Sequence, residues 1–216
     1  MKTILSEDEI NRLDYFKYAD KSIKYLNRKF ARKALSVKSE LLKKKFNNND
    51  VFEEFVLLYQ YLVSESEIEF LKLADTVYQK NSGKSKKTFS KKWLRTNVTD
   101  IPIPTTKYIY SKEAERKRNR AIEAINASDT YAKKSAELTK AMRMFSAQTK
   151  FYADYVTEIA AEEAMADSGE NKVLWITKKD EKVCEICSAR DNAVYDIGNI
   201  PERHLRCRCI LIPFTD

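Results

Sequence analysis

Turn-forming residues are rare in this chain: only three glycines and four prolines occur among its 216 residues. Because tight turns need such residues, the chain has few places where one short strand could be joined to the next. A hydrophobic content of 43% is nevertheless enough to fill a core. The sequence therefore predicts a mainly α-helical protein built from long helices.

Two long helices are expected in the N-terminal region, residues 1–83. Ser6 and Glu9 have the spacing of a capping box, so the first helix should begin there and extend to about Asn47. Asp50 is expected to cap the second helix. One face of the first helix is apolar (Phe16, Ala19, Ile23, Leu26, Phe30) and the opposite face is basic (Lys17, Lys21, Lys24, Arg28, Arg32). The apolar positions of the second helix are Phe52, Phe55, Tyr59, Leu62, Phe70, Leu73 and Val77.

A basic connector is expected at residues 84–110, where Pro102 and Pro104 exclude a regular helix and KKWLR predicts only a short one. Residues 84–120 hold 12 Lys and Arg against 3 acids, which indicates a polyanionic partner. Aromatic side chains between the lysines suit stacking on nucleic-acid bases. The candidate contacts are Lys84, Lys86, Lys87, Lys91, Lys92, Trp93 and Arg95. The alternative is a solvated link with one hydrophobic anchor.

Residues 111–170 predict a further long helix or helical hairpin that begins near Ser111 and ends with Gly169 as a left-handed cap. Its expected packing seam is Tyr131, Leu138, Met142, Phe145, Thr149, Tyr152, Val156 and Ile159. The adjacent acids Glu162 and Glu163 are interpreted as solvated surface. With the N-terminal helices, this region is expected to form an elongated helical bundle or hairpin body.

Residues 171–216 differ from the preceding helical regions in their residue pattern. KVLWITK and RCRCILIPF predict two short strands around a cysteine-rich segment. All four cysteines and the single histidine of the chain lie there: Cys184, Cys187, His204, Cys207 and Cys209. Paired ligands from two separate turns are how structural Zn²⁺ is held. The sequence thus predicts a small C-terminal α/β module stapled by zinc.

Five candidate side chains compete for the four positions of a tetrahedral zinc site. Cys184 and Cys187 form one pair, whereas the second pair can be drawn from His204, Cys207 and Cys209. A redox pair or a disulfide at CEIC is the main alternative to zinc. A catalytic zinc is disfavoured because four strong ligands leave no open position for water.

The C-terminal segment resembles the signature of the Mu F-like minor head proteins of tailed bacteriophages, also called phage head morphogenesis proteins. The matching residues are Trp175, Thr177, Asp180, Val183, Cys184, Cys187, Ile200, Pro201, His204, Cys207, Arg208 and Cys209. The resemblance covers about the last 45 residues and, more weakly, the preceding helix. It implies a few-copy protein of the capsid interior, attached to the portal, that acts in head assembly and in some relatives in DNA binding and ejection.

The expected partners are accordingly the portal protein and other head proteins, together with nonspecific contact to double-stranded DNA. The location implied is the virion, after assembly in the host cytoplasm. The start of the chain lacks the apolar run of a signal sequence, and no membrane contact is expected. The sequence lacks a Gly-rich phosphate loop, and its only histidine is assigned to the metal site, so enzymatic activity is not expected. The alternative function is a zinc-stabilised DNA-binding regulator.

Overall fold

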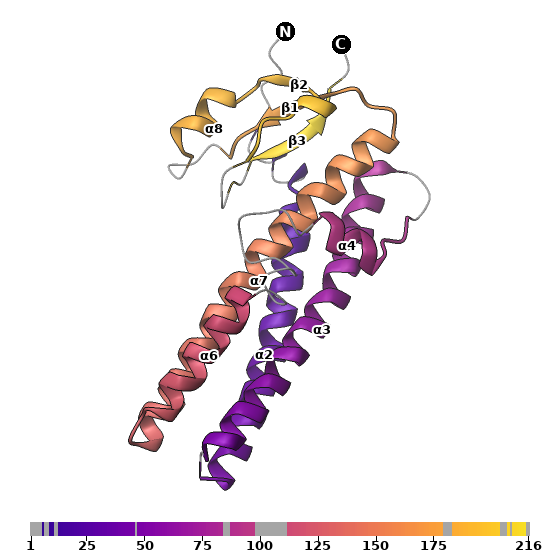
Figure 1. Ribbon diagram of the computed structural model, residues 1–216. Coiled ribbons are helices and arrows are strands. Elements are labelled where there is room, and N and C mark those ends of the chain that lie inside the picture. The colour runs from indigo at the N-terminus through magenta and orange to yellow at the C-terminus, as the bar shows by residue number, and fades with distance from the viewer. Residues whose placement is uncertain are drawn as a thin grey trace. The chain divides into compact units, whose positions relative to one another are not determined.

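The fold was determined as a computed structural model (Figure 1). It describes residues 6, 9–10, 13–45, 47–83, 87–97, 112–178, 183–203, 207 and 209–214. The side chains of Tyr59, Arg95, 112–118 and 144–148 are not among those described. Helices make up most of the described chain, and a small three-stranded sheet lies near its C-terminal end.

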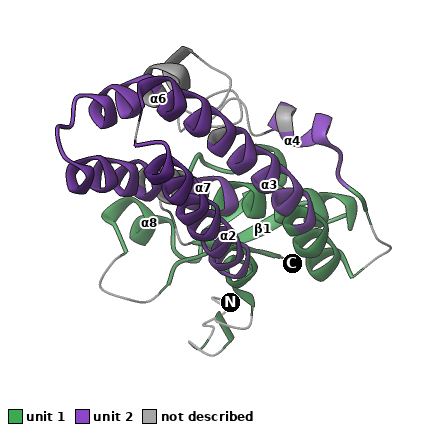
Figure 2. Ribbon diagram, turned by 90° about the horizontal axis from the view of Figure 1, so that it is seen from below, with its two compact units in different colours: residues 1–19, 73–88, 154–216 green, residues 20–72, 89–153 purple. Residues whose placement is uncertain are grey.

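The chain divides into two compact units, each assembled from separate segments (Figure 2). Unit 1 comprises residues 1–19, 73–88 and 154–216, and unit 2 comprises residues 20–72 and 89–153. Long helices pass from one unit into the other, so the units are not consecutive along the sequence. The metal-binding candidates all belong to unit 1.

Helices α2 (Phe16–Lys43) and α3 (Asn48–Ser82) form the predicted N-terminal pair. The expected apolar face of α2 is buried throughout, and the five basic residues of the opposite face are exposed. The capping box is also confirmed, because the Glu9 carboxylate accepts from the Ser6 backbone N–H at 2.8 Å and the Ser6 hydroxyl accepts from the Glu9 N–H at 3.3 Å. The periodicity of the sequence therefore located this packing surface correctly.

The boundaries of these two helices differ from the prediction. Helix α2 begins only at Phe16, whose backbone N–H donates to the Asp14 carboxylate at 2.9 Å. The cap of α3 is Asn47, which accepts from the Asn49 N–H at 3.0 Å, whereas Asp50 lies within the first turn. Phe52 is 48% exposed although Val51 and Phe55 beside it are fully buried, so Phe52 lies on the outer face of α3.

The later helices are α4 (Lys91–Asn97), α6 (Lys112–Asn126) and α7 (Tyr131–Asp167). The predicted short helix at KKWLR is α4, and the region from Lys112 forms the predicted hairpin, with Thr130 capping α7 through a hydrogen bond from the Lys133 N–H. Leu138, Thr149, Tyr152 and Val156 are buried as expected. Tyr131 is 43% exposed, because it opens the helix ahead of the packed part. Ser111 and residues 98–110 lie outside the described chain.

The C-terminal sheet has the strand order β2-β1-β3, with both neighbours antiparallel to β1. Its strands are β1 (Lys172–Ile176), β2 (Val194–Asp196) and β3 (Ile210–Pro213), and the short helix α8 (Glu185–Arg190) lies between β1 and β2. Both predicted strands are present. The short edge strand β2 was not predicted. Trp175 of β1 is the largest fully buried side chain of the described residues, so the sheet has its own small core.

No helix in the described part of the chain is long and apolar enough to cross a membrane.

Gly169 ends α7 with φ +83°, in the left-handed region, and the Glu170 N–H closes the turn onto the Met165 carbonyl at 3.3 Å. An added Cβ would meet no neighbour there, so only the backbone opposes a side chain. We expect Gly169→Ala to lower the free energy of unfolding by about 1–2 kcal/mol in urea titrations. Gly198→Ala is the matched control, since its site is equally open without a positive φ, and an equal loss in both variants would contradict this cause.

Candidate metal centre

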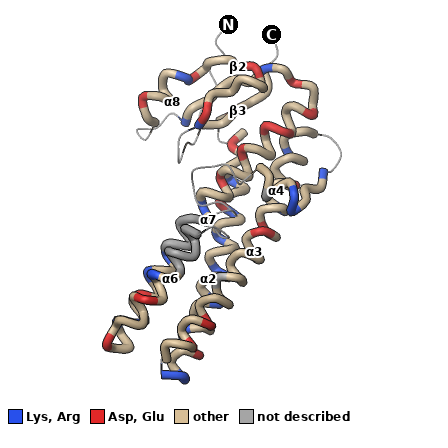
Figure 3. The backbone as a smooth tube through the Cα atoms, viewed as in Figure 1, with Lys and Arg blue, Asp and Glu red and all other residues tan. Residues whose placement is uncertain are grey.

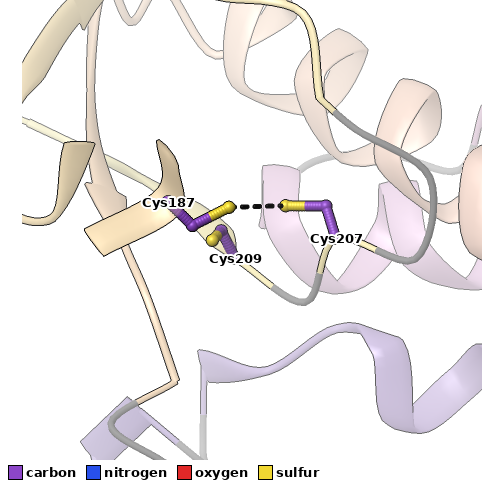
Figure 4. Close-up of side chains that lie close together, drawn as sticks. All are labelled: Cys187, Cys207 and Cys209. Atoms are coloured by element: carbon purple, nitrogen blue, oxygen red, sulfur yellow. Dashed lines mark hydrogen bonds between the residues drawn. The ribbon is translucent and has the colours of Figure 1, made fainter. Parts of the chain in front are cut away.

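The cysteines come from two separate segments of the C-terminal module, the start of α8 and the segment that precedes β3. Cys184 is the N-cap of α8 and Cys187 lies in its first turn, while Cys207 and Cys209 immediately precede β3. Cys187, Cys207 and Cys209 are at most 5% exposed. Their sulfur atoms all lie within 4.8 Å of one another, so two distant turns of the chain converge on one point (Figure 4).

The distance between the Sγ atoms of Cys187 and Cys207 is 3.7 Å. A disulfide needs about 2.05 Å, so these sulfurs are not bonded to each other. Two thiolates on one tetrahedral Zn²⁺, each about 2.3 Å from the ion, are separated by about 3.8 Å. The observed spacing therefore suits ligands of a tetrahedral ion.

As free thiols, the three side chains share their protons unequally. The pKa of Cys207 is lowered to about 5, because the Cys209 thiol donates a hydrogen bond to it and the charge of Arg203 is near. Burial raises the pKa of Cys187 to about 12. The hydrogen bond to Cys207, together with burial, raises the pKa of Cys209. The cluster thus favours a thiolate at one of its three sulfurs, which is the form that binds a cation.

Cys184 lies beside this group and supports it through the backbone. Its Sγ accepts a hydrogen bond from the Cys187 N–H at 3.4 Å, which is the kind of contact that orients a sulfur ligand. Cys184 is half-buried and is not part of the three-sulfur group. His204, the remaining predicted ligand, lies outside the described residues.

Arg203 fastens the cysteine segment to the rest of unit 1, and its side chain is only 7% exposed. Its Nη1 contacts Glu158 of α7 at 3.1 Å and donates to the carbonyl of Cys209 at 3.1 Å. Its Nη2 contacts Glu162 at 3.5 Å and donates to the Tyr15 hydroxyl at 3.1 Å. This guanidinium therefore joins the N-terminal segment, α7 and the backbone of a candidate ligand.

The two acids beside Arg203 depend on its charge, although the side chain of Glu162 stays 35% exposed. Burial raises the pKa of Glu158 to about 7 even though Arg203 opposes the shift, and burial also raises the pKa of Glu162. The interpretation of Glu162 and Glu163 as solvated surface was wrong, because Glu162 pairs with Arg203 and Glu163 pairs with Lys87 at 2.6 Å. The sequence does contain a signal for a buried cation that was overlooked: Glu158 and Glu162 lie one helical turn apart in the packed part of α7.

Arg203→Met should lower the free energy of unfolding by about 3–5 kcal/mol, because it leaves Glu158 buried without its counter-charge. Arg190 is a matched control: it lies over the same Trp175 ring at 5.3 Å, against 5.6 Å for Arg203, and donates to the Glu202 carbonyl. Arg190→Met should cost about 1 kcal/mol or less. Equal losses of unfolding free energy for Arg203→Met and Arg190→Met in denaturant titrations would show that the ion pairs with Glu158 and Glu162 do not stabilise the fold.

The predicted nucleic-acid contacts are distributed over both units. Lys87 lies between Glu163 and Asp167, at 2.6 Å from each, and Lys91 contacts Glu67 at 3.5 Å. Trp93 packs against the buried Phe89 with ring centroids 4.2 Å apart, which matches the expected hydrophobic anchor. Lys92 is exposed. Lys84, Lys86 and the side chain of Arg95 lie outside the described residues, and a DNA contact stays a prediction.

Comparison of the chain with models of known protein families, with curated proteins and with solved structures gives no match.

Proposed function

We propose that this chain is a minor head protein of a tailed bacteriophage, associated with the portal and acting in head morphogenesis, with a structural Zn²⁺ in its C-terminal module. The observation that carries the proposal is the cysteine cluster within a segment that resembles the Mu F-like signature. Three buried sulfurs within 4.8 Å of one another, two of them 3.7 Å apart, suit the structural zinc that the cysteine spacing predicts.

The metal would stabilise the folded C-terminal module. The sheet module consists of strands of three to five residues, which bury little apolar surface by themselves. Zn²⁺ held by Cys187, Cys207 and Cys209 would cross-link α8 to the segment before β3, and such binding energy is folding energy. Cys184 would complete the site, since its sulfur already accepts a hydrogen bond at the start of the same helical turn.

The chain as purified should contain about one Zn²⁺, measured by atomic emission, and a chelator should lower its melting temperature. Cys187→Ser, Cys207→Ser and Cys209→Ser should each lose the metal, because each removes a buried ligand. Cys184→Ser should also lose it, whereas His204→Ala should retain it. Loss of zinc in His204→Ala together with its retention in Cys184→Ser would move the fourth ligand to His204. Unchanged metal content in all the cysteine variants would rule out a zinc site here.

The head function is tested by the genes beside this one and by co-purification. We expect a portal frame and a capsid or scaffold frame to flank the gene, and the tagged chain, expressed with that portal protein, to form a complex that survives gel filtration. The Arg190→Met variant, which is expected to stay folded, should form the same complex, and a folded chain that fails to bind the portal protein would contradict the assignment.

Nonspecific DNA contact, if present, should show a steep dependence on salt and no preference among duplex sequences. A regulator would instead bind one short sequence and lose about 1–3 kcal/mol with each mismatch. Sequence-specific binding together with an isolated gene would overturn the head assignment in favour of the zinc-stabilised regulator.

A further inference from the structure

Unit 2 contains an apolar groove between α2 and α7 with a cavity of about 350 Å³. We name it the α2/α7 groove. Its wall from α2 runs from Asn27 to Lys38, and its wall from α7 runs from Leu138 to Arg143. The remaining lining residues are mainly apolar: Phe30, Ala31, Ala34, Leu35 and Met142. Small alanines between larger side chains leave the kind of channel into which a third helix can pack.

Apolar side chains at the groove face solvent in the described chain. Leu35 is 66% exposed, and Leu42, one heptad further along α2, is 50% exposed. Tyr131, one heptad before Leu138 on α7, is 43% exposed. Single exposed apolar residues are ordinary, but an aligned set beside a groove is typical of a surface that binds a helix.

The charge of the groove indicates which kind of helix can bind in it. Lys38 and Arg143 belong to the lining, and neither has an ion-pair partner within the described ranges. The lining contains no acid, and α2 as a whole carries nine Lys and Arg against two acids (Figure 3). A fitting occupant therefore has an apolar ridge with negative charge along it.

The chain itself carries such a face on α3. Its outward residues recur at helical spacing and are all exposed; they form the α3 stripe: Glu53, Leu57, Gln60, Ser64 and Ile68. Leu57 is 55% exposed and Ile68 is 43% exposed. Helix α3 carries seven acids against two bases, and Glu53 has no ion-pair partner among the described residues.

The two surfaces also agree in length. Leu57 and Ile68 are eleven residues apart, as are Asn27 and Lys38 on the groove wall, which corresponds to about 16 Å of helix. The stripe cannot reach the groove of its own chain, because the opposite face of α3, with Phe55, Leu58 and Leu62, is buried in the core.

We propose that the α2/α7 groove binds the α3 stripe of a second copy of this chain. Because the groove and the stripe are different surfaces, each copy offers one groove and one stripe to its neighbours. The proposal goes beyond the head function and does not depend on the metal site.

Sedimentation velocity over a series of concentrations tests this contact, with a charge swap as the decisive step. Lys38→Glu in the groove and Glu53→Lys in the stripe should each weaken association by about tenfold or more, since each brings like charges together. An equal mixture of the two variants should restore association, because each remaining pairing joins opposite charges. Raising the salt concentration should weaken the wild-type assembly.

Arg32→Glu is the matched control, since it changes the net charge equally at an exposed position that lies about 120° around α2 from Lys38 and outside the groove lining. It should leave association unchanged, and circular dichroism should show equal helix content in all variants. A monomer at every soluble concentration would overturn the proposal. So would an effect of Arg32→Glu equal to that of Lys38→Glu, or a mixture of Lys38→Glu and Glu53→Lys that fails to associate.

Discussion

A buried guanidinium is the contact on which unit 1 depends. The side chain of Arg203 is almost entirely shielded from water and forms ion pairs with Glu158 and Glu162. It also donates to the Tyr15 hydroxyl, which in turn accepts a hydrogen bond from the Leu211 N–H at 3.1 Å. Its removal from water is costly, and only the two acids and the aromatic and carbonyl partners around it offset that cost. The position of β3 relative to α7 therefore rests on charge pairing as well as on apolar packing.

The cysteine cluster and Arg203 act on the same short segment. The Cys209 carbonyl accepts from Arg203 while the Cys209 side chain faces the other two sulfurs. A cation at the sulfurs would thus be linked through one residue to the acids of α7. In our proposal the metal supplements the small core that three short strands can bury, and the ion pairs orient the resulting module within unit 1.

The helices were predictable because their apolar periodicity extends over many turns, so single exceptions such as Phe52 and Tyr131 did not obscure it. The grouping of Cys187, Cys207 and Cys209 was predictable, because a short spacing holds each pair of cysteines in one turn of the chain. Strand β2 was not, since three residues carry too little pattern and the strand is stabilised by its pairing with β1. Arg203 was missed because its hydrogen-bond partner Tyr15 is 188 residues away, and local sequence does not distinguish it from an exposed arginine.

The segmented composition of unit 1 has a consequence for biosynthesis. Unit 2 contains no residue beyond 153, so all of its segments are synthesised before the cysteine segment. Tyr15 and Glu158 therefore stay without their contact to Arg203, and in water, until Arg203 has been synthesised. Closing a loop of 188 residues is entropically expensive and makes this contact a late event. Nascent chains would therefore carry a folded helical unit and an open N-terminal segment until translation reaches the last strand.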